Sequence, residues 1–392
     1  MPRALMVSSS FLPGRGGIES YLGQLCDELS PHLAVLAPHE RDGKQIPADL
    51  SFATAGYRGT MLVPNRRIVN AIETEGDRHG VEKVLFGTPW PLVLLGPRLR
   101  ERGMAYSVIV HGAELLVPAA IPGLRMRLAQ ALSQADLLLA VSEFTGAKLR
   151  SFLLSLNQRV PPIDLLRARV DLERFHPDRA NKDVKSRLGL EEGQRFVLSF
   201  GRLVPRKGTD RLLRAADEIA LRAPDTAFVV AGTGPQLRRL NRLAAKSKAR
   251  VIFTGRVPED DAPGLYATAD VFAFPVVDRW FGLDVEGLGV VLLEAAACGT
   301  PCVTGRSGGT PEAVVEGESG YVVDATDPSA LVDRITCLLE DSEQATRMGA
   351  AGRSFVADEF SKRPLPRSLL KWLELEPVDD RSADREVTGQ EG

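Results

Sequence analysis

The sequence predicts an α/β protein with two doubly wound domains, each built on a parallel sheet covered by helices. Short apolar runs of strand length alternate with amphipathic stretches of helix length along most of the chain. At 392 residues the chain is long enough for two domains. A charged segment with little strand character, 171–194, separates two series of such units. We therefore expect one domain over residues 1–175 and a second over residues 190–354.

Composition and charge are those of an ordinary soluble protein, with 44% hydrophobic and 26% charged residues. A net charge of −2 offers no electrostatic argument for nucleic-acid binding. No signal peptide and no apolar run of membrane-spanning length is visible. Four cysteines lack the spacing of metal sites or secreted disulfides. We expect a cytoplasmic protein that keeps these as small buried thiols: Cys26, Cys298, Cys302 and Cys337.

The first domain opens with a short apolar strand, Ala4–Ser8, a glycine-rich loop and a helix over Ile18–Leu29. Gly16 and Gly17 in that loop would let the backbone approach a ligand closely, although a plain tight turn has the same composition. The three-glycine dinucleotide fingerprint is absent, so NAD binding is not supported. Further strands are expected at Leu33–Leu36, Lys83–Phe86, Ser107–Val110 and Leu137–Val141, with helices between them such as Pro91–Arg102 and Arg125–Ser133.

His111 directly follows the expected strand Ser107–Val110. Ligands in open parallel sheets bind beyond the carboxyl ends of the strands, which is where this imidazole is expected. An imidazole there can exchange hydrogen bonds with a substrate hydroxyl, and a structural histidine is the alternative.

The second domain begins with the strand Arg195–Phe200, followed by a loop with three cations within six residues. Such loops are often merely solvated. This one lies between a strand and the expected helix Asp210–Leu221, so Arg202 and Lys207 are predicted to point into a crevice and match a diphosphate. Later in this domain, the loop containing Val257 offers backbone groups to a base edge. Further elements are expected at Ala227–Ala231, Gln236–Lys246, Val251–Thr254, Asp270–Phe274 and Asp327–Glu340.

Two glutamates separated by seven residues organise the stretch 281–312. Glu286 lies in a glycine-rich loop, and Glu294 is predicted to lie between one and two turns into the helix that follows. The start of that helix, at Gly289 and Val290, presents backbone N–H groups and a positive dipole end, which suit a phosphate. Because carboxylates repel phosphate, we expect the glutamates to bind neutral hydroxyls of a ribose and a sugar. A pair of unrelated surface glutamates is the alternative.

After residue 349 the chain is predicted to be helical up to Trp372, with a break around Pro364 and Pro366. Residues 376–392 are acidic and have no apolar period, so we expect a disordered tail.

The ordered motifs resemble those of the retaining GT-B glycosyltransferases of the family 4 type, which use nucleotide sugars. The chain looks most like the actinobacterial phosphatidylinositol mannoside mannosyltransferases, and the resemblance covers roughly residues 3–372. It is carried by FLPGRGGIESYL, HGAE, SFGRLVPRKG, GLDVEGLGVVLLEAAACGTPCV and SGGTPE.

This resemblance implies two Rossmann-like domains facing across a cleft, with the helix at 355–375 crossing back to the first domain. It implies that Arg202 and Lys207 neutralise the donor diphosphate, that Glu294 holds the ribose and that Glu286 holds the hexose. The remaining implied contacts are those of Gly16 and Gly17 with the phosphates, the Val257 backbone with the base, Gly289 and Val290 with the donor, and His111 with the hexose or acceptor. Transfer would need no metal and no protein nucleophile.

The expected reaction is retaining transfer of mannose from GDP-mannose to a phosphatidylinositol mannoside. A UDP-sugar transferase with another lipid or soluble acceptor, and a non-catalytic sugar-nucleotide-binding protein, are the alternatives. Two departures from the family pattern leave the hinge and the acceptor open. RARVDLERF lacks the usual Pro-Gly before Val-Asp, and the segment Asp278–Phe281 resembles an insertion.

A lipid acceptor requires a surface that can face a membrane. Apolar residues stand beside cations at 61–67 and 115–128, where Arg66, Arg67, Arg125 and Arg127 occur. A protein bound peripherally to the inner face of the plasma membrane offers such a pattern to anionic lipid, and an ordinary core helix with a solvated basic face produces the same pattern.

Overall fold

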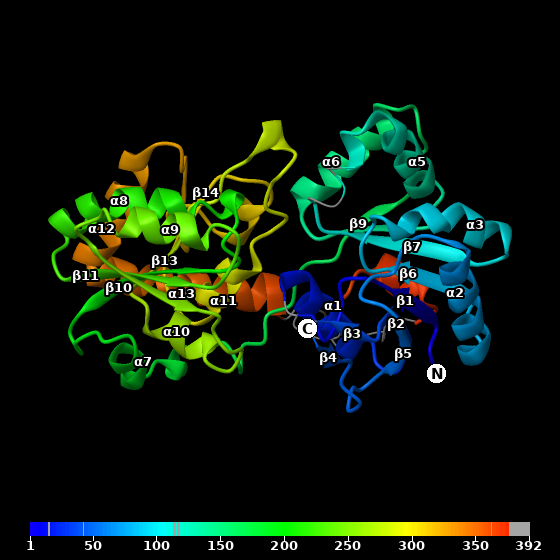
Figure 1. Ribbon diagram of the computed structural model, residues 1–392, viewed down its shortest axis with the longest axis horizontal. Helices are drawn as coiled ribbons and strands as arrows, with labels where there is room; N and C mark the ends of the chain where they lie inside the picture. Colours follow the sequence, from blue (N-terminus) through cyan, green and yellow to red (C-terminus); the bar gives the residue numbers. More distant parts are fainter. Residues whose placement is uncertain (15, 42, 113–114, 116–117, 362, 376–392) are drawn as a thin grey trace, which may run out of the picture.

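The computed structural model describes residues 1–375 except for 15, 42, 113–114, 116–117 and 362. Figure 1 shows two lobes side by side, one built from the first half of the chain and one from the second. Each lobe contains a parallel sheet with helices on both faces, as the alternating pattern predicts.

The first sheet has seven parallel strands in the order β5-β2-β1-β6-β7-β8-β9. Alternate residues of the interior strand β1 enter different clusters: Ala4 and Met6 on one face, Leu5 and Val7 on the other. A two-stranded antiparallel hairpin, β3 (Glu40–Arg41) with β4 (Lys44–Gln45), stands apart from it. The strands are β1 Ala4–Val7, β2 Leu33–Pro38, β5 Ala53–Tyr57, β6 Lys83–Phe86, β7 Ala105–Val110, β8 Leu138–Ala140 and β9 Ile163–Leu165. The helices are α1 Gly17–Glu28, α2 Arg66–His79, the 3₁₀ helix η1 Leu92–Leu95, α3 Gly96–Glu101, α5 Pro122–Ser133 and α6 Glu143–Leu154.

The second sheet has six parallel strands in the order β12-β11-β10-β13-β14-β15. The strands are β10 Arg195–Phe200, β11 Thr226–Ala231, β12 Arg250–Gly255, β13 Val271–Phe274, β14 Cys302–Gly305 and β15 Gly320–Val323. The α-helices are α7 Lys182–Arg187, α8 Thr209–Arg222, α9 Leu237–Ala244, α10 Ala262–Thr268, α11 Val290–Ala297, α12 Pro328–Glu340 and α13 Ser342–Val356. Short 3₁₀ helices are η2 Pro177–Arg179, η3 Pro205–Lys207, η4 Trp280–Gly282 and η5 Thr310–Ala313.

The last helix crosses back to the first lobe, as expected. A π-helical turn, Ala357–Ser361, follows α13, residues 363–366 are non-helical around the two prolines, and α14 (Arg367–Trp372) lies against the first sheet. Lys83 Nζ donates to the Trp372 carbonyl at 2.7 Å, and Ser368 Oγ donates to Asp164 at 2.6 Å. The largest hydrophobic cluster includes residues of both lobes and of α14, so the lobes share part of one core.

Most expected elements are present within one or two residues, and the differences have local causes. The expected helix at 91–102 is divided into η1 and α3, which meet at Gly96, where the ring of Tyr106 packs so closely that a Cβ would lie 2.5 Å from it. Three strands at or near sheet edges, β5, β9 and β15, lack a long apolar run and were not expected. All four cysteines are free, with three buried and Cys337 half-buried.

The strand order reverses beside β1 in the first sheet and beside β10 in the second. Such reversals create the crevices in which open α/β sheets bind ligands. Contacts between the loops that follow β7 and β13 show that the carboxyl ends of the two sheets face each other across the interface between the lobes.

Candidate active site

The loop after β10 carries two cations toward the loop after β13. Gly208 adopts a left-handed conformation (φ 66°), and a Cβ there would lie 1.7 Å from the Pro275 carbonyl oxygen. Only glycine allows the two loops to approach this closely. As a result, η3 places Arg206 and Lys207 beside the acidic residues of the loop after β13.

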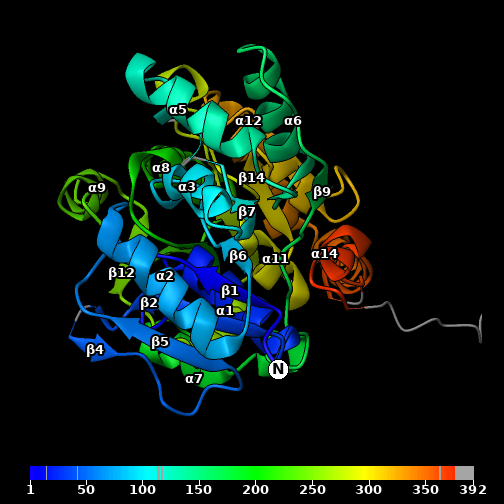
Figure 2. The ribbon, with the colours of Figure 1, turned by 90° about the vertical axis from the view of Figure 1, so that its right-hand side faces the viewer.

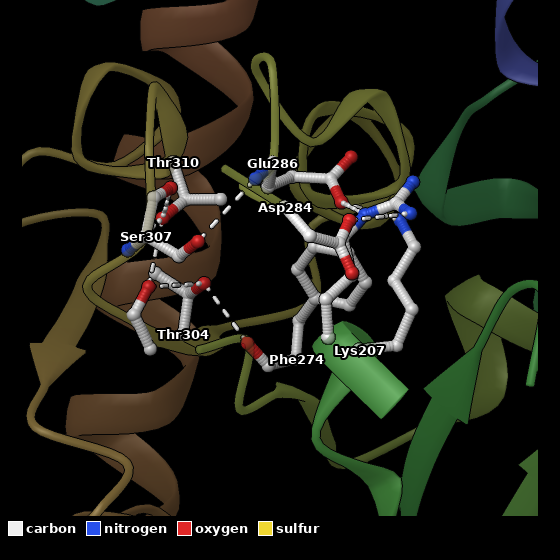
Figure 3. Close-up of polar contacts among 9 residues, drawn as sticks. Lys207, Phe274, Asp284, Glu286, Thr304, Ser307 and Thr310 are labelled. Carbon is white, nitrogen blue, oxygen red and sulfur yellow. Dashed lines mark hydrogen bonds and ion pairs between the residues drawn. The ribbon is translucent and has the colours of Figure 1, made fainter. Parts of the chain in front are cut away.

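These side chains form a partly buried cluster of four charges (Figure 3). Lys207 Nζ lies 2.9 Å from Glu286 Oε2 and 4.5 Å from the centroid of the Phe274 ring. Arg206 spans two carboxylates, with Nε 3.3 Å from Glu286 and Nη1 3.3 Å from Asp284. The Lys207 and Glu286 side chains are only 14% and 12% exposed, so this ion pair is shielded from water.

Burial and charge act differently on the two partners. Burial lowers the pKa of Lys207 below its usual value despite the attraction of Glu286. Burial alone would raise the pKa of Glu286, but the charges of Lys207 and Arg206 together outweigh it and hold that pKa below its usual value. Glu286 is therefore shared between two cations, and Asp284 supplies a second carboxylate beside Arg206.

The loop after β14 holds the backbone of Glu286 in place. The Gly309 N–H donates to the Glu286 carbonyl at 3.0 Å, and the Glu286 N–H donates to Ser307 Oγ at 3.3 Å. A Cβ on Gly308, which has φ 56°, would lie 1.8 Å from that same carbonyl oxygen. Thr310 Oγ1 fixes this loop by donating to the Gly305 carbonyl at 2.7 Å (Figure 3).

Glu294 lies in α11, whose amino end faces the same loops. Gly289 (φ 88°) precedes the helix, and no side chain caps this end. Glu294 is the fifth residue of α11, which agrees with the expected position. Burial raises the pKa of Glu294 to about 7, although Tyr266 OH donates to its carboxyl at 2.9 Å and opposes the rise.

His111 lies buried on the first lobe at the end of β7. Its Nε2 is 2.9 Å from the Gly87 carbonyl oxygen, and its ring meets Tyr21 edge to face at 5.3 Å. Its backbone carbonyl approaches Gly287 of the second lobe, where a Cβ would lie 2.0 Å from the oxygen. His111 and Glu286 are therefore brought to opposite sides of one interface.

The structure does not bring every predicted residue into the charged cluster. Arg202 is exposed, and its side chain makes no hydrogen bond or ion pair within the described part of the chain. Gly16 and Gly17 are exposed at the start of α1, and Val257 lies half-buried after β12. No contact among the described residues joins these three to the cluster. Their roles stay predictions.

Sequence reasoning did not single out Arg206 or Asp284. Arg206 is the middle cation of the loop that contains Arg202 and Lys207, and nothing in its spacing marks it. Asp284 precedes Glu286 by two residues, so a short acidic pattern, Asp-x-Glu, was the signal available.

The two lobes are joined by a carboxylate at a helix end. Glu312, in η5 of the second lobe, accepts hydrogen bonds from the Glu143 and Phe144 N–H groups at 2.8 Å each. Ser142 Oγ accepts from the Thr145 N–H and lies 2.8 Å from the Gly287 carbonyl oxygen. The amino end of α6 is thus capped largely from the opposite lobe, where its positive dipole end favours a carboxylate.

Among the described residues, no three His, Cys, Asp or Glu side chains form a group that could hold a metal ion. None of the helices within those residues combines the length and apolar character needed to cross a bilayer.

Comparisons with known proteins agree with this geometry. Residues 181–355 match the family model described as glycosyl transferases group 1. Among solved structures, sucrose-phosphate synthase from Thermosynechococcus elongatus has a TM-score of 0.77 at 22% identity, covering 91% of this chain and 95% of its own. WaaG, a glycosyltransferase involved in lipopolysaccharide biosynthesis, has a TM-score of 0.68 at 18% identity, covering 94% and 99%.

Relatives found by sequence have higher identity to this chain than these solved structures. The chain is 39% identical over 385 residues to the GDP-mannose-dependent alpha-(1-6)-phosphatidylinositol monomannoside mannosyltransferase of Mycolicibacterium smegmatis, covering 94% of this chain and 97% of that protein. It is 32% identical to the GDP-mannose-dependent monoacylated alpha-(1-6)-phosphatidylinositol monomannoside mannosyltransferase of Corynebacterium glutamicum, covering 96% and 98%. The fold and the sequence therefore define a GT-B glycosyltransferase. Within that class, the chain belongs to the family of phosphatidylinositol monomannoside mannosyltransferases.

The contact between Glu312 and α6 predicts a change in domain closure. Glu312→Ala removes two hydrogen bonds worth about 0.5–2 kcal/mol, enough to shift a closed–open equilibrium by up to roughly thirtyfold. We expect a larger radius of gyration in small-angle scattering of the ligand-free protein. Asp341→Ala is the matched control, because Asp341 caps α13 within one lobe by accepting from the Gln344 N–H at 2.8 Å. Equal radii for both variants and the parent would contradict the prediction.

Proposed function

We propose that this protein transfers a mannosyl group from GDP-mannose to a phosphatidylinositol mannoside, with retention of the anomeric configuration. The observation that carries the proposal is the buried Lys207–Glu286 pair beside the uncapped end of α11, with Glu294 in that same helix. The near full-length relatives, which are named for this donor and this class of acceptor, support it. Because the acceptor would be a membrane lipid, we propose peripheral action at the inner face of the plasma membrane.

In this proposal the donor diphosphate lies between the amino end of α11 and the cations of the loop after β10. Lys207, whose burial the neighbouring carboxylates offset only in part, would exchange Glu286 for the phosphates. Arg206, and Arg202 once that exposed side chain folds inward, would add charge. These groups stabilise the negative charge that develops on the departing GDP, a role that divalent ions have in other transferases. We therefore propose that no metal is needed.

Glu286, released from Lys207, would accept hydrogen bonds from hexose hydroxyls, and Glu294 would accept from the ribose. His111 lies across the interface from Glu286, which suits contact with the hexose or the acceptor. Gly289 and Val290 would offer backbone N–H groups to the donor, Gly16 and Gly17 would approach the phosphates, and the Val257 backbone would contact the base.

The chemistry needs no protein nucleophile. The acceptor hydroxyl oxygen bonds to the anomeric carbon from the face that the phosphate leaves, and the bond from that carbon to the phosphate oxygen breaks. The acceptor proton passes to an oxygen of the departing diphosphate. The protein contributes position and charge stabilisation in a cleft shielded from water.

The donor is tested by thermal denaturation with GDP-mannose and with UDP-glucose, each with and without a chelator. A ligand that binds only the native protein stabilises it by about 2.7 kcal/mol at one hundred times its Kd. We expect GDP-mannose to raise the melting temperature and UDP-glucose to leave it unchanged. A shift with UDP-glucose alone would replace the mannose donor with a UDP-sugar, and a GDP-mannose shift that vanishes with chelator would overturn metal independence.

The site is tested by transfer assays on Lys207→Met and Glu286→Gln, which keep the size of each side chain. We expect kcat to fall by about 10²- to 10³-fold in each, as for the loss of one group that stabilises transition-state charge. Glu318→Gln, an exposed glutamate of the same lobe, is the control and should keep full activity. GDP-mannose binding without measurable transfer by the unmodified protein would favour the non-catalytic alternative, and full activity in both site variants would mean that the site lies elsewhere.

The raised pKa of Glu294 predicts that donor binding depends on pH. Above a pKa of about 7 the carboxylate is charged and accepts strongly from the ribose hydroxyls, whereas below it the neutral acid accepts weakly. We expect the Kd of GDP-mannose to rise roughly five- to tenfold as the pH falls from one unit above that pKa to one unit below. Titration calorimetry on Glu294→Gln should show weak binding with no such slope. An identical slope in that variant would assign the effect to another group.

A further inference from the structure

The segment between β13 and the loop that carries Glu286 contains two adjacent exposed aromatic residues. Trp280 is 61% exposed and Phe281 is fully exposed, and they are the only aromatic residues among the large exposed hydrophobics of the described chain. Large apolar rings held in water are characteristic of surfaces that bind a partner. The turn that carries them is therefore a candidate contact surface.

The backbone holds this turn in one shape. The Arg279 N–H donates to the Asp284 carbonyl at 3.0 Å, and the Asp284 N–H donates to the Arg279 carbonyl at 3.2 Å. Trp280 and Phe281 both have positive φ, 48° and 55°, a conformation that side chains with a Cβ rarely adopt. The turn thus presents its rings outward at a fixed point of the chain.

The turn lies on the same side of the molecule as α5 and α6 of the first lobe. In Figure 1 the yellow segment around residue 280 projects upward beside these helices, and Figure 2 shows it behind α5 at the same height. Exposed apolar side chains also occur on α5 and α6 or next to them: Ile121, Met126 and Leu154.

The helices on this side are basic. Arg125, Arg127, Lys148 and Arg150 are exposed on α5 and α6. Between 122 and 154 there are two acidic residues: Asp136 pairs with Arg100 at 2.5 Å, and Glu143 is exposed at the start of α6, where its backbone N–H donates to Glu312. The four cations therefore outnumber the one exposed carboxylate of Glu143 on these helices. None of these four cations forms an ion pair with another described residue, although Arg125 Nη2 donates to Ser155 Oγ at 3.1 Å. Apolar side chains among such cations complement the hydrocarbon boundary and the negative charge of an anionic bilayer.

We propose that the Trp280–Phe281 turn and the exposed face of α5 and α6 together form a docking surface for an anionic membrane. The proposal rests on the proposed function, because a lipid acceptor must reach the cleft from a bilayer. Trp280 and Phe281 would enter the interfacial region, while the arginines of α5 would contact lipid headgroups. The two lobes would then straddle the lipid surface on either side of the cleft.

The turn is also connected to the donor site. Asp284 closes the turn through its backbone and binds Arg206 through its side chain at 3.3 Å, and Arg206 in turn contacts Glu286. Two residues, Asp284 and Arg206, thus connect a lipid contact at the turn with Glu286, the carboxylate proposed to bind the hexose. This placement makes the turn a positioning element for the acceptor.

The test uses the whole protein with vesicles of phosphatidylcholine, with and without phosphatidylinositol. We expect tighter binding to the vesicles with phosphatidylinositol, and quenching of tryptophan emission by lipids brominated on their acyl chains. The chain has three tryptophans, so Trp280→Phe should remove most of the quenching while vesicle binding is largely kept. Equal quenching in Trp280→Phe would overturn the proposal.

Further variants separate the two parts of the surface. Trp280→Ser with Phe281→Ser should weaken vesicle binding at least tenfold, and Arg125→Glu with Arg127→Glu should abolish the preference for phosphatidylinositol. Leu221→Ser, which removes an equally exposed apolar side chain from α8, should have no effect. Unchanged vesicle binding in the double serine variant would also overturn the proposal.

The melting shift with GDP-mannose in these variants distinguishes this proposal from the proposed function. Loss of vesicle binding with an unchanged GDP-mannose shift supports the docking surface and leaves the donor site intact. Vesicle contact through Trp280 in a protein that shows no GDP-mannose shift would support the surface and overturn the proposed donor.

Discussion

The buried ion pair between Lys207 and Glu286 depends on a close approach of backbones that only glycine permits. Gly208 lies against Pro275, and Gly308 lies against the Glu286 carbonyl. These contacts fix three loops from neighbouring strands of one sheet, those after β10, β13 and β14. The charges they carry are brought together and partly buried before any ligand binds, so a donor would exchange ion-pair partners without having to assemble the loops.

Without a ligand, the charged side chains of the site pair with one another. Glu286 forms an ion pair with Lys207, and Arg206 bridges Glu286 and Asp284. In the proposed function, binding of an anionic donor would exchange these partners. The exchange would be favoured because a diphosphate carries more negative charge than Glu286, the carboxylate that Lys207 and Arg206 share. It also frees Glu286 for neutral hydroxyls, so one substitution of partners would prepare both the phosphate and the sugar contacts.

The interface between the lobes includes the loop that carries Glu286. Gly287, next to Glu286, meets His111 and Ser142 of the first lobe, and Glu312 caps α6 from the second. Movement of the lobes would therefore alter the surroundings of Glu286. The Trp280–Phe281 turn also contacts the charged cluster, because Asp284 closes the turn and accepts a hydrogen bond from Arg206.

Much of the fold follows from the sequence, since alternation of buried strands and amphipathic helices is a local property of the chain. It predicted both central sheets, the helix that carries Glu294 and the break before α14. Short strands at sheet edges, such as β5 and β9, were not predicted, because half-exposed strands need no continuous apolar run.

Residue types and spacing determined that cations, glutamates and glycines stand at strand ends. Only the tertiary structure decided which of them meet. Arg206 rather than Arg202 joins Glu286, because Arg206 lies in η3, which packs beside the loop after β13, whereas Arg202 precedes that helix. Glu312 reaches the N–H groups of residues 143 and 144 across 169 and 168 positions of sequence. Local patterns carry no information about such distant contacts, since these depend on how two separately folded lobes pack together.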